Sequence, residues 1–275
     1  MNLLFVGDIF GKPGREIARR AIPALVATRQ IDLVIANVEN SAAGFGVTGD
    51  IGQTILEYGV DVMTSGNHVW DKKEVLEYFP TQPRLLRPAN FPAGVPGRGS
   101  YVARTRTGEP VGVLNLMGRV FMTPLDDPFA AALREIESLR AKARVIFVDF
   151  HAEATSEKVA MGWHLDGRVT AVVGTHTHVQ TADERILPKG TAYLTDTGMT
   201  GPTDSIIGVT VEAALGRFIT GMPAKFEAAS GPARLNAVIV TADPATGKAT
   251  AIERINLSAQ DVEALAAHAT DAVRG

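Results

Sequence analysis

One stretch of the chain, at residues 145–151, decides the fold: Val145-Ile146-Phe147-Val148-Asp149-Phe150-His151. It is apolar almost throughout and rich in β-branched and aromatic residues, and it ends in a histidine. A continuous apolar run of this length is typical of a strand that is buried on both faces. The stretch therefore predicts an inner strand of a parallel sheet, with a polar side chain at its carboxyl end.

Similar runs recur along the chain and alternate with segments that have helical patterns. The strand-like runs are residues 3–6, 33–38, 60–64, 111–116, 145–150 and 169–173. The helix-like segments between them are residues 15–29, 48–58, 72–79, 128–141 and 156–164. This alternation predicts an α/β fold with βα units and a largely parallel sheet that helices cover on both faces.

The pattern changes in two places. Residues 80–99 are rich in proline and glycine, which predicts a long irregular loop that is either a lid or a cover for a sheet edge. Beyond Arg185, the runs at 192–195, 233–241 and 250–255 predict antiparallel strands, and residues 258–273 predict a closing amphipathic helix. Because there is no internal repeat or low-complexity linker, we expect one domain over residues 1–275.

Composition restricts the class of protein. The chain has 275 residues, of which 45% are hydrophobic and 21% charged, as in a globular protein with a sizeable core. The net charge of −3 argues against a general basic surface for long nucleic acid. The absence of cysteine excludes disulfides, thiolate catalysis and Cys-based metal sites. No signal-peptide pattern and no run of about 18 apolar residues occurs, so we expect a soluble cytoplasmic protein without a membrane partner.

Metal-ligating residue types stand where the strand-like runs end. Four of the six histidines lie in such positions: His68, His151, His176 and His178. Oxygen donors end similar runs: Asp8, Glu39, Asn40 and Asn67. Parallel sheets collect ligands at the carboxyl ends of their strands, and in an extended segment His176 and His178 point to the same side. The pattern predicts one site with two metal ions.

Single motifs allow simpler interpretations. Asp8 could cap the following helix, residues 37–46 could form an Asx-rich turn, and His68 could be a hydrogen-bonded structural residue. The glycines of residues 7–15 lack the spacing of a phosphate-binding loop. The pair His176 and His178 is harder to explain as core, because His151 ends the preceding strand. A barrel hydrolase with an early His-x-His and a serine hydrolase with Gly-x-Ser-x-Gly are both disfavoured.

Taken in order, five motifs resemble the ligand motifs of calcineurin-like metallophosphoesterases, and more narrowly those of the YmdB-type branch of bacterial phosphodiesterases. They are Asp8, Glu39, Gly66-Asn67-His68, His151 and Gly174-Thr175-His176-Thr177-His178. Residues 7–11, 39–42, 151–158 and 198–202 also match that branch, and the resemblance spans essentially the whole chain. It implies an αββα sandwich with a mostly parallel first sheet and a more antiparallel C-terminal sheet.

The resemblance also implies a ligand set. The first metal would be held by Asp8, Glu39, Asn40 and His178. The second would be held by Glu39, Asn67, His151 and His176, so that Glu39 bridges the two. The wider superfamily has a histidine where this chain has Phe10, and the branch fills that vacancy with Asn40. Members of the branch use iron or manganese, and a mixed oxygen and nitrogen ligand set does not choose between them.

The activity that the resemblance implies is hydrolysis of a phosphodiester, with 2′,3′-cyclic or 3′,5′-cyclic nucleotides as the favoured small-molecule substrates. Two cations would bind a bridging hydroxide and clamp the phosphoryl oxygens, and His68 would act as the general acid. Asp71 or Asp149 is expected to orient a histidine. The alternatives are a phosphomonoesterase or small nuclease on the same site, or a metal-binding regulatory protein with incidental activity.

Three further expectations concern the surroundings of the site. Arg104, Arg106 and Arg119 are candidates for phosphate contacts, although exposed arginines are usually just solvated. The loop at 198–208, with Thr200, Thr203 and Ser205, borders the substrate or is an ordinary glycine-rich surface loop. We also expect a homo-oligomer that pairs through a sheet edge or through residues 80–99.

Overall fold

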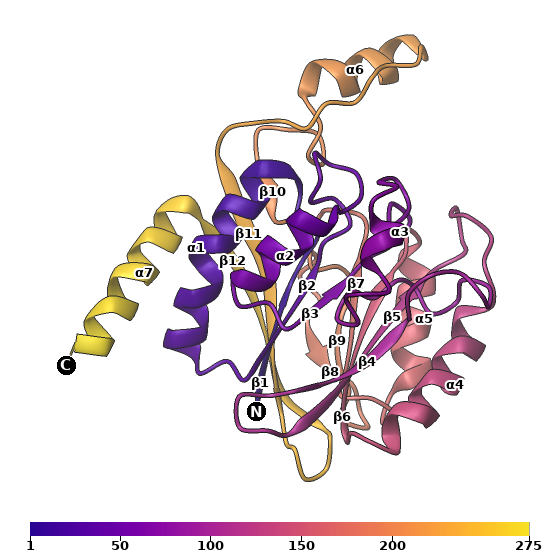
Figure 1. The fold of residues 1–275 in the computed structure, drawn as a ribbon, viewed down its shortest axis with the longest axis vertical. Helices are drawn as coiled ribbons and strands as arrows, with labels where there is room; N and C mark the ends of the chain where they lie inside the picture. The colour runs from indigo at the N-terminus through magenta and orange to yellow at the C-terminus, as the bar shows by residue number, and fades with distance from the viewer. Residues whose placement is uncertain (275) are drawn as a thin grey trace.

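Two six-stranded mixed β-sheets pack face to face, and helices cover the outer face of each sheet (Figure 1). The computed structural model describes the backbone of residues 1–274 and the side chains of residues 1–269. The carboxyl ends of the parallel strands of both sheets point toward one end of the molecule. That end carries the polar motifs found in the sequence.

The first sheet has the strand order β10-β11-β1-β2-β3, with β12 paired to β11. Strands β1, β2 and β3 are parallel, whereas β11 runs antiparallel to β1 with Leu3 opposite Val240. Strands β10 and β12 are both antiparallel to β11. The strands are β1 Asn2–Val6, β2 Leu33–Asn37, β3 Val62–Thr64, β10 Gly201–Pro202, β11 Ala233–Ala242 and β12 Ala249–Ser258.

The second sheet has the order β4-β5-β6-β7-β9-β8. Its four inner strands, β5, β6, β7 and β9, are parallel, and the two edge strands are antiparallel to their neighbours. The strands are β4 Ser100–Arg104, β5 Pro110–Met117, β6 Val145–His151, β7 Ala171–Thr175, β8 Arg185–Ile186 and β9 Ala192–Leu194. The stretch 145–151 is therefore an inner parallel strand, as the sequence predicts, and every residue of it is buried.

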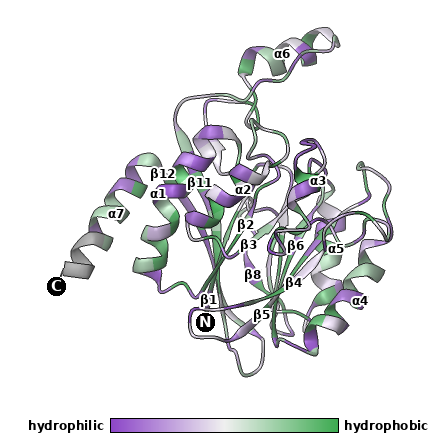
Figure 2. Ribbon diagram, in the orientation of Figure 1, coloured by the Kyte–Doolittle hydropathy of each residue, from purple (hydrophilic) through white to green (hydrophobic). Residues whose placement is uncertain are grey.

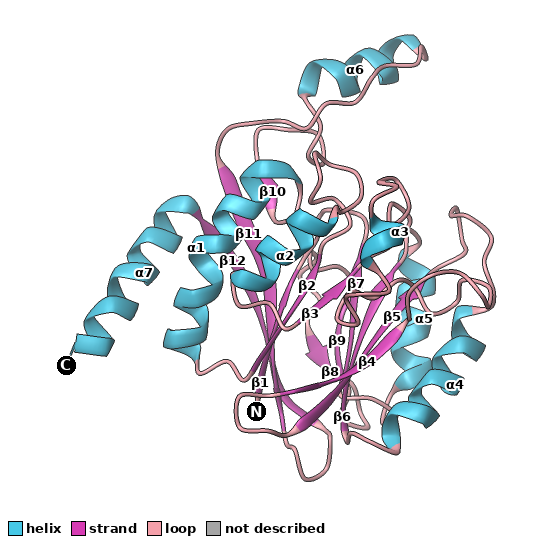
Figure 3. Ribbon diagram, viewed as in Figure 1, coloured by secondary structure: helices cyan, strands magenta, loops and turns pink. Residues whose placement is uncertain are grey.

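The helices form the two outer layers of the sandwich (Figure 3). Helices α1 Gly11–Arg29, α2 Gly49–Glu57, α3 Val75–Tyr78 and α7 Ala259–Arg274 cover the first sheet. Helices α4 Pro128–Arg140 and α5 Thr155–Leu165 cover the second sheet. Helix α6, Val211–Thr220, projects from the body of the molecule (Figure 1). Among the helices within the described range, none is both long enough and apolar enough to cross a bilayer.

Local sequence explains where several helices begin and end. The Thr48 side chain accepts a hydrogen bond from the Ile51 backbone N–H and caps α2, and Asp127 caps α4 directly before Pro128. Both are preferred arrangements for a helix start. Helix α1 ends at Gln30, which takes the left-handed conformation with φ 50°. The predicted helix ends differ from the observed ones by only a few residues.

Alternate residues of the central strands point to opposite layers. In β1, Leu3 and Phe5 face the second sheet, whereas Leu4 and Val6 face the helices. The Phe5 ring packs against Phe147 of β6 with the ring centroids 5.1 Å apart, so this aromatic pair joins the two sheets within a largely aliphatic layer. Figure 2 shows how hydrophobic residues run along the strands, and hydrophobic residues are also present on α6, where Phe218 and Ile219 are largely exposed.

The α/β sandwich of two sheets is confirmed, but the antiparallel C-terminal strands do not make up the second sheet. Strands β11 and β12 extend the first sheet next to β1 instead. Strand β11 is apolar on both faces: Val238 and Val240 pack between the sheets, while Ala237 and Ile239 pack under the helices. A strand that is apolar on both faces is suited to an inner position, and β11 takes one beside β1.

Residues 80–99 cover a sheet edge. Leu85 forms a parallel bridge with Met63 of β3, and Leu86 bridges to Arg98 and packs in the core between the sheets. The Asn90 side chain donates a hydrogen bond to the Met117 carbonyl at the end of β5, 2.8 Å away. This segment therefore joins the two sheets at their edges, which is the second of its two predicted roles.

We predict that Phe147→Ala lowers the free energy of unfolding by about 3–5 kcal/mol, because it opens a cavity where the two sheets meet. Urea denaturation measures the change. The control is Phe121→Ala, which removes a ring that is 89% exposed and should alter stability little. Equal effects of the two substitutions would contradict the packing described for β6.

Candidate metal centre

The eight residues predicted for the site come from five strand ends of the two sheets. Asp8 follows β1, Glu39 and Asn40 follow β2, and Asn67 and His68 follow β3. His151 is the last residue of β6, and His176 and His178 follow β7. The face-to-face sandwich brings these ends together.

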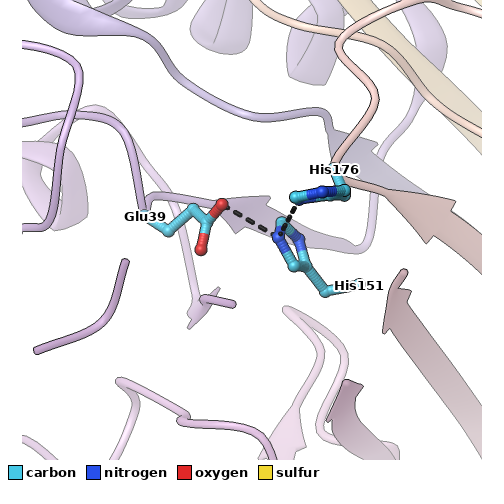
Figure 4. Close-up of side chains that lie close together, drawn as sticks. All are labelled: Glu39, His151 and His176. Atoms are coloured by element: carbon cyan, nitrogen blue, oxygen red, sulfur yellow. Dashed lines mark hydrogen bonds and ion pairs between the residues drawn. The ribbon is translucent and has the colours of Figure 1, made fainter. Parts of the chain in front are cut away.

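His151 is at the centre of one group of donor atoms. Its Nε2 lies 2.9 Å from Glu39 Oε1 and 3.0 Å from His176 Nδ1 (Figure 4). Asn67 Oδ1 also lies 3.0 Å from it. One ring nitrogen carries at most one hydrogen, so it cannot satisfy three acceptors. These four nitrogen and oxygen atoms are therefore better suited to binding one shared cation than to hydrogen-bonding with one another.

The opposite nitrogen of His151 is held by a chain of hydrogen bonds. The Thr175 hydroxyl donates to Asp149 Oδ1 over 2.7 Å and therefore accepts from His151 Nδ1, 2.9 Å away. This places one ring hydrogen on Nδ1, so Nε2 is the nitrogen that would bind a metal. Asp149 is thus one of the orienting residues that the sequence suggested.

A second group of donors comprises Asp8, Asn40 and His178. His178 Nδ1 donates to the Ile207 carbonyl over 2.8 Å, so its Nε2 has a free lone pair, 3.3 Å from Asn40 Oδ1. The Asn40 amide nitrogen donates to the Gly44 carbonyl, which fixes the direction of its oxygen. Asp8 Oδ1 is buried and has no hydrogen-bond partner among the described residues. A metal ion would provide that partner.

Buried negative charge dominates the electrostatics of the centre. Asp8, Glu39 and Asp149 are 0%, 1% and 0% exposed. Burial raises the pKa of Asp8 well above its usual range, and the nearby Glu39 carboxylate adds to this. Burial alone would lower the pKa of His151, but the surrounding carboxylates, above all Glu39, outweigh it and raise the pKa to about 9. The site therefore attracts positive charge, which a proton supplies in part and a cation would supply fully.

The histidine loop after β7 has a strained backbone. His176 and His178 have φ angles of 103° and 65°, in the left-handed region that residues other than glycine rarely occupy. Such conformations cost free energy and persist only where the surroundings enforce them. Here the two left-handed conformations direct the imidazoles of His176 and His178 into the site.

A buried ion pair holds the backbone of this loop in place. Lys158 Nζ lies 2.5 Å from Asp196 Oδ2 and donates to the Thr175 carbonyl over 2.7 Å. The same Asp196 carboxylate accepts from the backbone N–H groups of Thr177 and Gly198, at 3.1 and 2.8 Å. Both charged side chains are 1% exposed. The pair therefore holds the backbone on either side of His176.

His68 is placed differently from the other three histidines. Its backbone N–H donates to Glu39 Oε2 over 3.1 Å, and its Nδ1 lies 2.8 Å from Asp71 Oδ2. The Phe45 ring packs edge-on against the imidazole at 5.1 Å between centroids. With Nδ1 bound to Asp71, Nε2 is the nitrogen that His68 offers to a ligand. Both orienting carboxylates suggested by the sequence thus contact a histidine, Asp71 directly and Asp149 through Thr175.

A cavity of about 380 Å³ opens over these groups. Its polar side is lined by Glu39, Asn40, His68, Glu153, His176, Thr177 and His178. The other side is apolar and is lined by Phe10, Phe45, Ile207, Val209 and Phe226, with Gly44. No residue of the 80–99 segment lines this cavity, so within the described structure the segment is no lid over the site.

Sequence reasoning missed Glu153, Lys158 and Asp196 as parts of the centre. Glu153 Oε2 lies 3.0 Å from His176 Nε2 and lines the cavity. Its position two residues after His151, at the end of a strand, was an available signal. Lys158 and Asp196 carry no such signal, because their pairing depends on how α5 packs against the second sheet.

Other candidates lie away from the cavity. Arg104 donates to the Gly108 carbonyl, Arg106 donates to the Ile31 carbonyl, and Arg119 lies 3.6 Å from Asp127. None of the three lines the cavity, so the expected phosphate contacts are absent from the described site. In the 198–208 loop, Thr200, Thr203 and Ser205 do not line it either, but Ile207 does.

The fold and the donor set together define a class. An αββα sandwich that gathers carboxylate, amide and imidazole ligand atoms at its strand ends, beside a further histidine that Asp71 orients, is a metallophosphoesterase-type hydrolase. Glu39, His151 and His176 form a group whose ligand atoms lie within 4.8 Å of one another.

Comparison with known proteins identifies the family. A family profile described as "YmdB-like protein" matches residues 4–255, and the chain belongs to this family. The chain is 49% identical over 255 residues to the 2′,3′-cyclic-nucleotide 2′-phosphodiesterase of Bacillus subtilis, covering 93% of this chain and 96% of that one. It is 37% identical over 273 residues to a putative phosphatase/phosphodiesterase of Mycoplasma genitalium, covering 97% of this chain and 96% of that one.

Two solved structures share the fold. A hypothetical protein from Thermus thermophilus has a TM-score of 0.88 and 44% identity, covering 94% of this chain and 99% of that one. A phosphatase from Mycoplasma pneumoniae has a TM-score of 0.88 and 37% identity, covering 94% of this chain and 93% of that one.

We predict that Lys158→Met weakens metal binding by roughly 10- to 100-fold, the range found when outer partners of metal ligands are removed. It should also lower the free energy of unfolding by about 3–5 kcal/mol, because Asp196 is left buried and unpaired. Manganese titration calorimetry and urea denaturation measure the two effects.

The matched control is Lys12→Met, since the Lys12 side chain is 78% exposed in its ion pair with Glu16. It should change neither quantity by much. If Lys158→Met bound manganese as tightly as the unaltered protein, the ion pair would not be what holds the histidine loop.

Proposed function

We propose that this protein is a dinuclear-metal phosphodiesterase that opens 2′,3′-cyclic nucleotides, with 3′,5′-cyclic nucleotides as further substrates. The observation that carries the proposal is the group of ligand atoms around His151 Nε2, which lies beside His68 and the cavity that His68 lines. The substrate follows from the name of the B. subtilis relative, which is 49% identical over 93% of this chain.

The ligand sets are those implied by the sequence resemblance. Asp8, Glu39, Asn40 and His178 would hold one cation, and Glu39, Asn67, His151 and His176 the other. Two contacts support this assignment, since His151 and His178 each donate from Nδ1 to a fixed oxygen and keep Nε2 for a metal. Bound cations supply positive charge for the phosphoryl oxygens and activate water. Iron and manganese both suit the donor set.

The protein's own groups place the substrate and move the proton. Asp71 orients the His68 imidazole through Nδ1, so a protonated Nε2 can donate to the departing ribose oxygen. For a 2′,3′-cyclic nucleotide, a water oxygen adds to phosphorus and the bond from phosphorus to O2′ breaks. O2′ takes the proton from His68, and the product is a nucleoside 3′-phosphate.

A phosphomonoesterase is the second candidate function. The Mycoplasma relatives are named as a putative phosphatase/phosphodiesterase and as a phosphatase, and a cavity of about 380 Å³ would also admit a monoester. Assays of the metallated protein on cyclic nucleotides and on nucleoside monophosphates separate the two. Faster hydrolysis of the monoesters would favour the second function.

We predict that Glu39→Gln removes both metal ions and the activity together, because it deletes the carboxylate shared by the two ligand sets. Metal content by mass spectrometry and hydrolysis of 2′,3′-cyclic AMP are the measurements. Glu57→Gln, at an exposed position at the end of α2, is the control and should keep both. A Glu39→Gln variant with two metals and full activity would contradict the assignment.

We predict that His68→Ala keeps the metals but lowers kcat by roughly 10²- to 10⁴-fold, the usual contribution of a general acid. Asp71→Asn should lower kcat in the same direction but less, since the imidazole stays in place. A His68→Ala variant with unchanged kcat would show that the proton comes from another group.

A further inference from the structure

The apolar side of the cavity has no part in the proposed chemistry. Three of its side chains, Ile207, Val209 and Phe226, come from the segment that leads to and from helix α6. No other segment supplies as many residues to that side. This segment therefore supplies much of the apolar wall of the cavity.

Backbone hydrogen bonds make that wall rigid. The Thr210 N–H donates to the Glu227 carbonyl over 3.0 Å, and the Ala229 N–H donates to the Gly208 carbonyl over 2.8 Å. An antiparallel bridge also joins Val209 to Ala228. The two segments that flank α6, residues 207–210 and 226–229, are thus paired at its base. We call this pair of segments the neck.

The neck is also anchored to the metal centre. A Cβ at Gly208 would lie 2.6 Å from the Phe10 ring, so the backbone approaches that ring closely. Phe226 packs on the small cluster of Phe10, Met199 and Val209. Ile207 accepts the hydrogen bond of His178 Nδ1, which fixes the neck to a predicted metal ligand.

The ring of Phe226 is held in place by its neighbours on the neck and on α6. The Arg217 guanidinium of α6 lies over its ring, 5.0 Å from the centroid, and the ring is partly buried. An aromatic ring that is supported by a cation in this way and also lines a ligand cavity is suited to stacking. The neck side chains that line the cavity are apolar, and the Ile207 carbonyl is already taken by His178.

We infer that the neck is the nucleobase subsite. Phe226 stacks on the base while Ile207 and Val209 enclose it, and the neck makes no hydrogen bond to the edge of the base. The inference rests on the proposed function, because it places the cyclic phosphate at the metal ligands across the same cavity. The cavity volume of about 380 Å³ falls within the usual range of small-ligand sites. Purine and pyrimidine substrates should therefore be accepted alike.

The test compares nucleotides with a base-free substrate. The four 2′,3′-cyclic nucleotides and methyl riboside 2′,3′-cyclic phosphate are assayed with the unaltered protein and with Phe226→Ala. We expect kcat/KM for the four bases to agree within about tenfold. Phe226→Ala should raise KM for all four by roughly 5- to 100-fold, the loss of one base–aromatic stack, with kcat and the base-free substrate little changed.

Two further variants control for structure. Phe226→Trp keeps a stacking surface and should restore a low KM. Phe218→Ala removes a ring of α6 that is 79% exposed and should have no effect on KM. Equal loss on the base-free substrate, or a preference above 100-fold for one base, would overturn the subsite. If the unaltered protein hydrolysed none of the five substrates, the proposed function itself would fail instead.

Discussion

The structure depends on buried negative charge that has to be compensated. Three carboxylates, Asp8, Glu39 and Asp149, are almost entirely buried where the strands of both sheets end. Burying an unpaired carboxylate costs several kcal/mol, so a chain that buries three in one place needs cationic partners there. The same carboxylates raise the pKa of His151 to about 9, because they stabilise its positively charged form.

A cation can bind only if the imidazole lone pairs converge, and a neighbouring oxygen orients each ring through its Nδ1. Thr175 and Asp149 hold the Nδ1 of His151, the Ile207 carbonyl holds the Nδ1 of His178, and Asp71 holds that of His68. Close packing adds a steric limit, since a Cβ at Gly66 would lie 2.2 Å from the His151 ring. The orientation of His151 and His178 therefore depends on contacts with segments that are 24 and 29 residues away in the sequence, whereas that of His68 is set locally.

The amino-acid sequence predicts the features that depend on strand ends, but not those that depend on packing between elements. Apolar runs predict strands, and parallel strands place their carboxyl ends on one side of the sheet. The sequence could therefore point to Asp8, Glu39 and His151 as neighbours. The position of β11 beside β1 could not be read from its apolar pattern, which fits an inner strand of either sheet. The same holds for the pairing of Lys158 with Asp196, which are 38 residues apart, and for the aromatic platform of Phe226. The roles of the ligands and of His68 remain predictions.

The central claim is that Glu39 serves two metal ions at once. The most direct test is a crystal structure of the protein grown with manganese, with anomalous scattering data collected near the manganese edge. We expect two anomalous peaks per chain, one beside His151 and His176 and the other beside Asp8 and His178, with a Glu39 oxygen at each. A single peak, or two peaks with Glu39 at neither or only one, would contradict the shared role of this carboxylate.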